Sequence, residues 1–437
     1  MRKLTFLGGI HPMDGKALTM NYPILPIAAG KVLVYRLTQH IGAAATPLVK
    51  KGDTVLRGQK IAEANGFVSA PIHASVSGKV KAIEPRRIVS GEMMQSIVVE
   101  NDDAGTCVAF TRQDKQATDE QIRNAIREAG IVGMGGAGFP TAVKLSPKEP
   151  EKIDYIIANC AECEPYLTSD YRRMLEEPQR IIEGLRIVLR LFRNAVGILA
   201  IEDNKPEAIK VLKKAIREDH RITVKTVKTK YPQGAERQLI YALTGRAISS
   251  AKLPADVGCI VQNADTLSAI SKAIHEGMPL LERIVTVTGD APIGPGNYRV
   301  PIGTGFMDLV NSIGGFRTQP EKIICGGPMM GVAMFDLNVP ITKTATALLA
   351  FVEDPLKNQR IEACINCGRC LSVCPGRIMP SKLAICAETL DRETFVELHG
   401  MECCECGCCS YICPAKRPLT QWIKSMRKME LARRKKA

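Results

Sequence analysis

The sequence lacks any hydrophobic run long enough to cross a membrane. Its longest apolar stretches, residues 195–201 and 345–352, are far shorter than the roughly 18 residues that a transmembrane helix needs. The first ten residues include basic side chains, but their apolar stretch is too short for a signal peptide. We therefore expect no membrane-spanning segment, and any association with a membrane would be peripheral.

The chain also lacks a nucleic-acid recognition motif, although it is basic. Its formal net charge is +14, from 59 Lys and Arg minus 45 Asp and Glu, and without a motif this charge does not predict nucleic-acid binding. Beyond Cys413 there are nine basic residues and one acidic residue, Glu430, so the C-terminal end has a formal net charge of +8. This end is expected either to bind anionic lipid, an acidic ferredoxin or a partner subunit, or to be a solvated helix end with a frayed tail. The nine residues are Lys416, Arg417, Lys424, Arg427, Lys428, Arg433, Arg434, Lys435 and Lys436.

Two copies of the pattern C-x2-C-x2-C-x3-C-P are present, the first ending at Pro375 and the second at Pro414. Three closely spaced thiolates can bind three corners of one four-iron cluster, and in two-cluster ferredoxins the fourth cysteine binds the other cluster. The spacing therefore predicts two 4Fe-4S clusters with exchanged fourth ligands. The first would be held by Cys364, Cys367, Cys370 and Cys413, and the second by Cys403, Cys406, Cys409 and Cys374.

The alternatives for these cysteines are a disulfide framework or zinc sites. Zinc motifs usually pair C-x2-C with a distant second pair, rather than placing four thiols within eleven residues. Cys404 and Cys408 lie inside the second motif but break its spacing, so we expect them not to be ligands. Cluster assembly needs reduced thiols, which favours a cytoplasmic compartment for this chain of sixteen cysteines.

With 437 residues, the chain is expected from its length to form about three domains. Residues 24–99 indicate short strands between glycine turns, with strands over residues 31–35, within 47–62 and within 70–83. The pattern is similar to a barrel-sandwich hybrid, the fold of biotinyl and lipoyl domains. No lysine is placed for carrier attachment around residues 62–75, which favours a scaffold over a swinging-arm carrier.

A glycine-rich loop follows a predicted helix over residues 119–130. Gly133, Gly135 and Gly138 match G-x-G-x-x-G, but the dinucleotide fingerprint requires a strand before the loop, so a standard Rossmann site is not predicted. Phosphate binding remains an expectation, because glycines let backbone amides approach a phosphate, the next segment can offer a helix N-terminus and Lys144 supplies charge.

A strand over residues 153–158 leads into the polar segment Asn159-Cys-Ala-Glu-Cys-Glu-Pro165. The carboxyl end of a strand is where α/β folds place ligands, so this segment is expected at a binding site. Cys160 and Cys163 form a C-x2-C pair, for which a redox pair or a third metal site is the alternative. Because no second pair lies nearby, we favour thiols that are either buried or bystanders, without such a role.

Three motifs resemble the flavin and NADH pocket of the complex I flavoprotein subunit. They are Gly-Met-Gly-Gly-Ala-Gly-Phe-Pro-Thr-Ala-Val-Lys at residues 133–144, the polar segment at 159–165, and Gln-Asn-Ala-Asp-Thr at 262–266. With Gly-Gly-Ile-His-Pro at residues 8–12 and the doubled ferredoxin motif, the chain is more similar to the RnfC family. Members of that family are a subunit of the ion-pumping Rnf ferredoxin:NAD oxidoreductase complex. The resemblance covers nearly the whole chain, except the tail after Lys424.

The resemblance implies which residues hold FMN and NAD(H), with no catalytic side chain because the flavin mediates the reaction. Two departures from the complex I pattern are Ala161 in place of Asp and Ala235 in place of a second Glu, which make the pocket less acidic. For Glu162 and Glu164, surface salt bridging is the alternative role. The matching residues are Gly133, Gly135, Gly136, Gly138 and Lys144 in the loop, Asn159, Glu162 and Glu164 in the polar wall, Gly234 and Glu236 facing the nucleotide, and Asn263 and Thr266 near the flavin phosphate.

The last part of the chain combines a β-grasp module and the cluster domain. A helix over residues 304–313, with Thr304 as N-cap, is expected in an SLBB-type β-grasp module that bridges flavin and clusters rather than binding its own ligand. A polar linker over residues 353–360 follows, and short helices are expected over 380–388 and 391–399. The cysteine motifs form an internal repeat offset by 39 positions, 413 minus 374, and the insert resembles helical ferredoxin domains.

The sequence thus predicts a multidomain protein of α/β and β type. The expected regions are a barrel-sandwich-hybrid domain (1–105), a complex I flavoprotein-like FMN/NADH-binding α/β domain (106–280), an SLBB β-grasp domain (281–352), a helical double 4Fe-4S ferredoxin domain (353–423) and a basic tail (424–437).

The resemblance implies an enzyme subunit that exchanges hydride between NADH and FMN and passes single electrons through the clusters. A flavin can exchange electrons in pairs or singly, which gives a reason for one chain to carry both sites. The partners would be the membrane subunits and the ferredoxin-type subunit of an Rnf complex, which couples this transfer to Na+ or H+ translocation. The chain would lie peripherally on the cytoplasmic face of the bacterial inner membrane. The alternatives are a soluble flavin and iron–sulfur cobalamin reductase, or a non-enzymatic cluster relay and docking scaffold with a degenerate flavin pocket.

Overall fold

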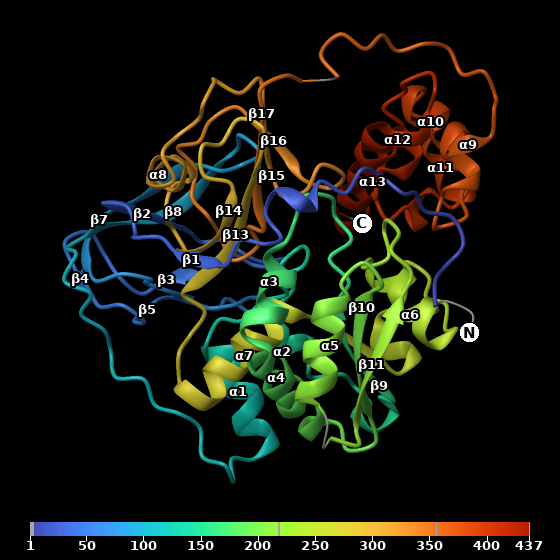
Figure 1. Cartoon of the computed structure of the whole chain (residues 1–437). Helices are drawn as coiled ribbons and strands as arrows, with labels where there is room; N and C mark the ends of the chain where they lie inside the picture. Colours follow the sequence, from blue (N-terminus) through green and yellow to red (C-terminus); the bar gives the residue numbers. More distant parts are fainter. Residues whose placement is uncertain (1–3, 217–218, 355, 437) are drawn as a thin grey trace.

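The computed structural model describes residues 4–216, 219–354 and 356–436. It arranges them as a barrel-like β region, a parallel sheet with helices, a mixed sheet and a helical C-terminal region (Figure 1). The linker predicted over residues 353–360 is largely exposed, although its Pro355 lies outside the described residues.

The barrel-sandwich region consists of two small sheets, and all of its strand pairs are antiparallel. Its core lies between the sheets, where the buried Tyr35 accepts a hydrogen bond from the backbone N–H of Ser75 at 2.9 Å. One sheet has the order β2 (Val32–Arg36), β8 (Met93–Asn101), β7 (Gly78–Arg87) and β4 (Thr54–Val55), and the other has β3 (Thr46–Pro47), β5 (Lys60–Glu63) and β6 (Ile72–His73).

The central region is a parallel sheet wound in two directions. Its strand order is β11 (Ile222–Val227), β10 (Val196–Glu202), β9 (Tyr155–Cys160) and β12 (Cys259–Asn263), so the order of winding reverses between β9 and β12. In open α/β sheets ligands bind outside the carboxyl ends of the strands at such a switch point. The fold therefore marks the ends of β9 and β12 as a binding site.

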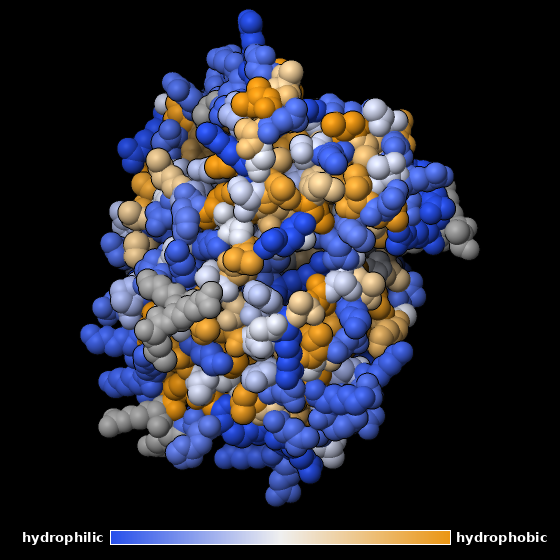
Figure 2. All heavy atoms as spheres, turned by 90° about the vertical axis from the view of Figure 1, so that its right-hand side faces the viewer, coloured by the Kyte–Doolittle hydropathy of each residue, from blue (hydrophilic) through white to orange (hydrophobic). Residues whose placement is uncertain are grey.

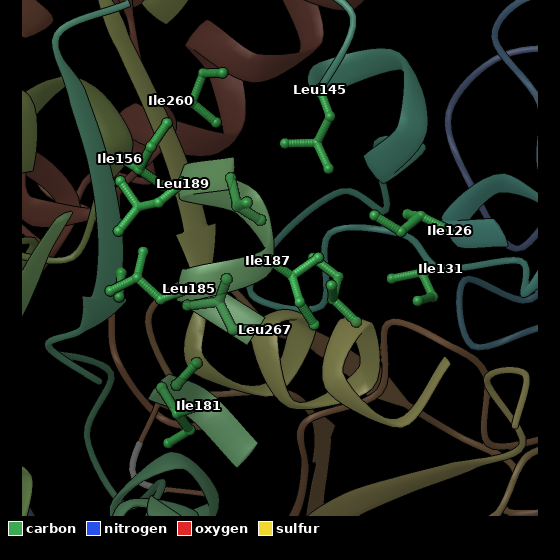
Figure 3. Packing of buried hydrophobic residues seen from close by; sticks show 14 of the residues in the cluster. Ile126, Ile131, Leu145, Ile156, Ile181, Leu185, Ile187, Leu189, Ile260 and Leu267 are labelled. Carbon is green, nitrogen blue, oxygen red and sulfur yellow. The ribbon is translucent and has the colours of Figure 1, made fainter. Parts of the chain in front are cut away.

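Alternating residues of β9 belong to different hydrophobic cores. Ile156 belongs to a core that includes residues of α1 (Asp119–Glu128), α4 (Pro178–Leu191) and α7 (Ala264–Glu276), whereas Ile157 belongs to a core that includes residues of α6 (Glu236–Thr244). Figure 3 shows the larger core, in which leucines and isoleucines of the helices meet those of the sheet. The two-residue period of the strand thus buries both faces of the sheet.

The mixed sheet is the β-grasp region, with the order β1, β14, β13, β17, β15 and β16. The N-terminal strand β1 (Ile24–Pro26), expected in the barrel-sandwich region, pairs here in parallel with β14. The predicted helix exists as α8 (Phe306–Ser312), but the prediction of Thr304 as its N-cap was wrong. Gly305 occupies that position, and its backbone N–H donates to Asp308 Oδ2 at 3.3 Å. The remaining strands are β13 (Glu282–Gly289), β14 (Gly296–Pro301), β15 (Lys322–Cys325), β16 (Val332–Met334) and β17 (Ala347–Phe351).

The C-terminal region is helical. Its last helix, α13 (Leu419–Lys436), continues through the residues expected to form a separate basic tail, so the expected boundary at residue 424 lies inside a helix. Ile423 and Met426 of this helix are buried, and Arg427 pairs with Glu405. The side chains of Lys435 and Lys436 lie outside the described residues. The shorter helices are α9 (Arg369–Ser372), α10 (Pro380–Glu388), α11 (Arg392–Glu397) and α12 (Cys408–Ile412).

The helices were expected to include no membrane-spanning segment. Over the parts of the chain that the structure describes, none of them combines the length and the apolar character that spanning a bilayer requires.

Candidate functional site

A cavity of about 550 Å³ lies at the carboxyl ends of β9 and β12. This volume is within the range of small-molecule and cofactor sites in proteins. Its wall combines the glycine-rich loop, the segment after β9, the loop before α6 and loops of the β-grasp sheet. The predicted residues on the wall are Gly135, Gly136, Asn159, Glu162, Glu164, Gly234 and Asn263.

Lys144 and Glu236, both predicted to contact the nucleotide, contact each other. Lys144 Nζ donates to Glu236 Oε1 at 2.6 Å and to the backbone oxygen of Val261 at 2.8 Å. Helix α2 (Thr141–Lys144), which ends at Lys144, is a single turn, so its N-terminus adds little to the field at the cavity. The structure therefore does not bring the expected phosphate-binding cation to the cavity wall.

Gly133, Gly138 and Thr266 shape the glycine-rich loop behind its lining residues. The backbone N–H of Gly133 donates to the Phe139 oxygen at 2.8 Å, and the backbone N–H of Met134 donates to Thr266 Oγ1 at 3.0 Å. Gly138 has a left-handed backbone (φ +74°), and a Cβ atom there would lie 2.8 Å from Thr344 Cγ2. Glycine is therefore required at this position by both backbone conformation and packing.

Glu162, just past β9, has its carboxylate inside the protein. The carboxylate accepts the backbone N–H groups of Asp170 at 2.7 Å and Tyr171 at 3.2 Å, at the start of α3 (Ser169–Glu176). Burial raises the pKa of Glu162 above its usual range, although the nearby Lys16 opposes this. The alternative of an ordinary surface salt bridge was wrong for this residue.

Glu164 connects the central sheet to the β-grasp region. Its carboxylate accepts the backbone N–H groups of Met329 at 3.3 Å and Met330 at 2.8 Å, in the loop between β15 and β16. Burial raises its pKa to about 7. The β-grasp module thereby supplies part of the cavity wall, a role that the sequence interpretation missed, although the run Cys-Gly-Gly-Pro-Met-Met-Gly at residues 325–331 was a visible signal.

Three further lining residues were not singled out as binding residues from sequence. Asp170 accepts a hydrogen bond from Asn263 Nδ2 at 2.7 Å, and burial raises the pKa of this carboxyl. Tyr231 lies in the loop before α6, and Arg36 is the last residue of β2. No local pattern marks Arg36, because it reaches the cavity only through the packing of separate regions.

In the C-x2-C pair at the end of β9, Cys160 is buried and Cys163 is half-buried. Cys160 is fully buried, and Cys163 Sγ accepts the backbone N–H of Gly234 at 3.2 Å on the cavity wall. Burial raises the pKa of both thiols, that of Cys163 to about 12, which keeps them protonated. Cys160 is thus a buried thiol as expected, whereas Cys163 is half-buried and lines the cavity.

The cysteine motifs have repeated backbone geometry. The third residue of each motif, Asn366 or Glu405, is left-handed, as are the glycines Gly368 and Gly407 two positions later. Arg377 and Lys416, three residues after the last cysteine, are left-handed as well. Each pair is separated by 39 positions, which confirms the internal repeat. Left-handed turns of this kind direct successive amides to one point and favour anionic groups there.

The cysteines predicted to bind the second cluster line one small cavity of about 20 Å³. Cys374, from the first motif, lies there with Cys403, Cys406 and Cys409, and so do Cys404 and Cys408. In the first set, Cys370 and Cys413 pack against the apolar cluster around Cys409, while Cys367 is exposed. Among the described residues, no three His, Cys, Asp or Glu side chains are arranged to hold a single metal ion.

The loop of the second cysteine motif, residues 403–413 (the second cysteine loop), contacts the wall of the large cavity. Tyr231, on the cavity wall, donates from its hydroxyl to the backbone oxygen of Cys406 at 2.8 Å. Glu402 pairs with Arg237 of α6 at 2.9 Å and accepts the Ser250 hydroxyl at 2.6 Å. The C-terminal region therefore lies beside α6, as Figure 1 shows. Figure 2 views this side, where hydrophilic and hydrophobic residues are mixed.

These features define a multidomain protein built around an FMN-binding domain. The family model of the Nuo51 FMN-binding domain matches residues 126–272, that of the RnfC barrel sandwich hybrid domain matches 4–104, and that of the SLBB domain matches 284–333. All three confirm the expected fold class.

Close relatives span nearly the whole chain. The subunit designated C in the proton-translocating ferredoxin:NAD(+) oxidoreductase complex of Clostridium ljungdahlii is 44% identical, with 97% of this chain and 93% of that protein covered. The subunit of the same designation in the Na(+)-translocating complex of Acetobacterium woodii is 42% identical, with 99% and 98% covered. The chain belongs to the RnfC family. Among solved structures, an NAD+-reducing [NiFe]-hydrogenase is 20% identical with a TM-score of 0.49, covering 64% of this chain and 57% of that chain.

Proposed function

We propose that the chain is the NADH-, FMN- and iron–sulfur-binding subunit of an Rnf complex, an ion-translocating ferredoxin:NAD(+) oxidoreductase. The observation that carries the proposal is the direct contact between the cavity at the switch point and the second cysteine loop, through Tyr231 and Cys406. Both near-full-length relatives are named as subunits of ferredoxin:NAD(+) oxidoreductase complexes. Bound FMN would supply the conversion between paired and single electrons.

The residues on the cavity wall fit a flavin and a nicotinamide nucleotide. Gly136 presents open space where a Cβ would stand, so its backbone leaves room for a ligand. Asn159 and Asn263, at the ends of adjacent strands, would orient the ligand with their amides. The cavity also argues against a degenerate pocket, even though Ala161 and Ala235 make it less acidic than the complex I pattern.

For the iron–sulfur groups we propose two 4Fe-4S clusters with exchanged fourth ligands. The shared cavity of Cys374, Cys403, Cys406 and Cys409 supports this arrangement for the second cluster. The repeated backbone supports an equivalent first cluster on Cys364, Cys367, Cys370 and Cys413. The second cluster would lie nearer the flavin, because its loop contacts the cavity wall.

The proposed function also implies a location and partners for the chain. We propose a peripheral position on the cytoplasmic face of the bacterial inner membrane. The membrane subunits and the ferredoxin-type subunit would be the partners of the first cluster, whose proposed ligand Cys367 is exposed. The sixteen cysteines, all free in the structure, support a reducing compartment. The expected domain boundaries remain part of this proposal.

The test is anaerobic reconstitution followed by iron, sulfide and FMN quantitation and titration with NADH. About eight irons and one flavin per chain are expected, as two cubanes require. Gly138→Val is expected to lose FMN and NADH-driven cluster reduction, because its side chain meets Thr344 in a strained backbone. Gly52→Val is the control, since Gly52 is left-handed too but has open space around it. Normal flavin content and cluster reduction in Gly138→Val would mean that the site is elsewhere.

A further inference from the structure

Arg36 is the one cation among the described residues that line the cavity. It ends β2 and so comes from the barrel-sandwich region, which the sequence suggested was only a scaffold. The carboxylates on the same wall already have partners. Glu162 accepts two amides of α3, Glu164 accepts two amides of the β-grasp loop, and Asp170 accepts the amide of Asn263.

The guanidinium of Arg36, in contrast, has unused hydrogen-bonding capacity. Its Nε atom is buried and has no hydrogen-bond partner among the described residues. Burial lowers the pKa of this side chain, which reflects the cost of keeping a cation away from water. An uncompensated guanidinium on the wall of a ligand-sized cavity is stabilised when an anion enters that cavity.

The chemistry of the anion follows from the shape of the guanidinium. Its planar fork of donors matches phosphate oxygens, which it can bind through two parallel hydrogen bonds. Lys144, expected to supply the charge for a phosphate, is already bound by Glu236 and the Val261 oxygen. Arg36 is thus the cationic side chain that is available in the cavity to bind a nucleotide.

We propose that Arg36 binds a phosphate group of the nucleotide held in this cavity. The group is either the phosphate monoester of FMN or the diphosphate of NADH, which share the same chemistry. The inference rests on the proposed function, and it makes the barrel-sandwich region a part of the nucleotide site.

The test compares Arg36→Gln with Lys31→Gln in the full-length, cluster-reconstituted protein. Lys31 precedes the same strand, is exposed and does not line the cavity. Its replacement therefore removes one positive charge at a position away from the proposed site. Equilibrium dissociation constants are measured for FMN, for riboflavin, which lacks the phosphate, and for NADH with the FMN-loaded protein. Arg36→Lys, which keeps the charge but not the fork, provides a second variant with less risk to folding.

The loss of one charged hydrogen-bonding partner is expected to weaken binding about tenfold or more. Weaker binding of FMN with unchanged riboflavin binding assigns Arg36 to the monoester, and weaker binding of NADH alone assigns it to the diphosphate. Arg36→Lys is expected to show a smaller loss on the same ligand. Unchanged affinities, or an equal loss for FMN and riboflavin, would overturn the inference. Failure of the unmodified protein to bind FMN would instead overturn the proposed function.

Discussion

Lys343 is a buried lysine that joins three regions of the molecule. Its Nζ atom donates to the backbone oxygens of Pro71 and Gly130, each at 2.6 Å. Pro71 belongs to the barrel-sandwich region, Gly130 begins the glycine-rich loop, and Lys343 itself lies between β16 and β17 of the β-grasp sheet. Because both acceptors are uncharged, burial lowers the pKa of the lysine from 10.5 to about 7.

This shift predicts that the contribution of Lys343 to stability depends on pH. Between pH 7 and pH 10.5 the unfolded chain binds more protons at this lysine than the folded chain. The contribution of Lys343 to the free energy of unfolding therefore rises with pH. The slope from one group is up to about 1.4 kcal/mol per pH unit. In denaturation of the metal-free protein, the advantage of the unmodified chain over Lys343→Met should therefore grow as pH rises. Exposed Lys50→Met is the control, and parallel pH curves for the chain and Lys343→Met would contradict the expectation.

Binding-site residues could be predicted from the sequence where they belong to a recognisable local motif. Asn159 and Asn263 lie at the carboxyl ends of largely apolar strands, and the structure places both on the cavity wall. Lys144 also stands in a motif, but the sequence does not reveal that Glu236 neutralises it. Arg36 has no motif, and about a hundred residues separate it from the glycine-rich loop, so only tertiary packing brings it to the cavity.

At the scale of elements, the close packing of α4 on α7 positions one wall of the cavity. A Cβ atom at Gly184 of α4 would lie 1.9 Å from the backbone oxygen of Leu267, which no side-chain rearrangement can relieve. Asn263 is the N-cap of α7, and its side chain accepts the backbone N–H of Asp265 at 2.8 Å. A displacement of α7 would therefore move a residue of the candidate flavin site.

Gly184→Ala is expected to lower the free energy of unfolding by about 2–3 kcal/mol, because the two helices must separate. It should also reduce the affinity for FMN, since Asn263 moves with α7. Thermal melting and flavin fluorescence measure the two effects. Gly245→Ala, at a left-handed helix end with open space around it, should cost only about 1 kcal/mol and leave FMN affinity unchanged. Equal effects of the two substitutions would show that the helix contact is not the cause.

The elements themselves differ in how far sequence could predict them. Helix α10 has the expected bounds, because Pro380 begins it and its apolar residues follow the helical period. The sequence interpretation ended the cluster domain before residue 424, because the residues after it are mostly basic. It therefore missed that α13 continues through them, with Ile423 and Met426 buried on one side. The parallel pairing of β1 with β14 joins Ile24 to Asn297, which are 273 positions apart, and no local pattern specifies it.

At the scale of the whole molecule, the two cysteine motifs occupy different positions despite their equal spacing. The second motif is attached to the nucleotide-binding region through Tyr231 and Glu402. The residue before Cys374 is attached to the N-terminal segment, where the Gly9 N–H donates to the Val373 oxygen at 2.8 Å. Cys367 of the first motif is exposed. The arrangement predicts an inner cluster beside the flavin and an outer cluster that faces partners.

Cys374→Ser tests this arrangement, because the residue belongs to the first motif but lies in the cavity of the second. We expect iron to fall from about eight to about four per chain and the electron paramagnetic resonance signal of the inner cluster to disappear. The outer cluster should still form and accept electrons from dithionite, but NADH should reduce it far more slowly, because the inner cluster no longer connects it to the flavin. Cys386→Ser, at a buried cysteine of α10 outside both motifs, is the matched control. Loss confined to the cluster on Cys364, Cys367 and Cys370 would show that the fourth ligands are not exchanged.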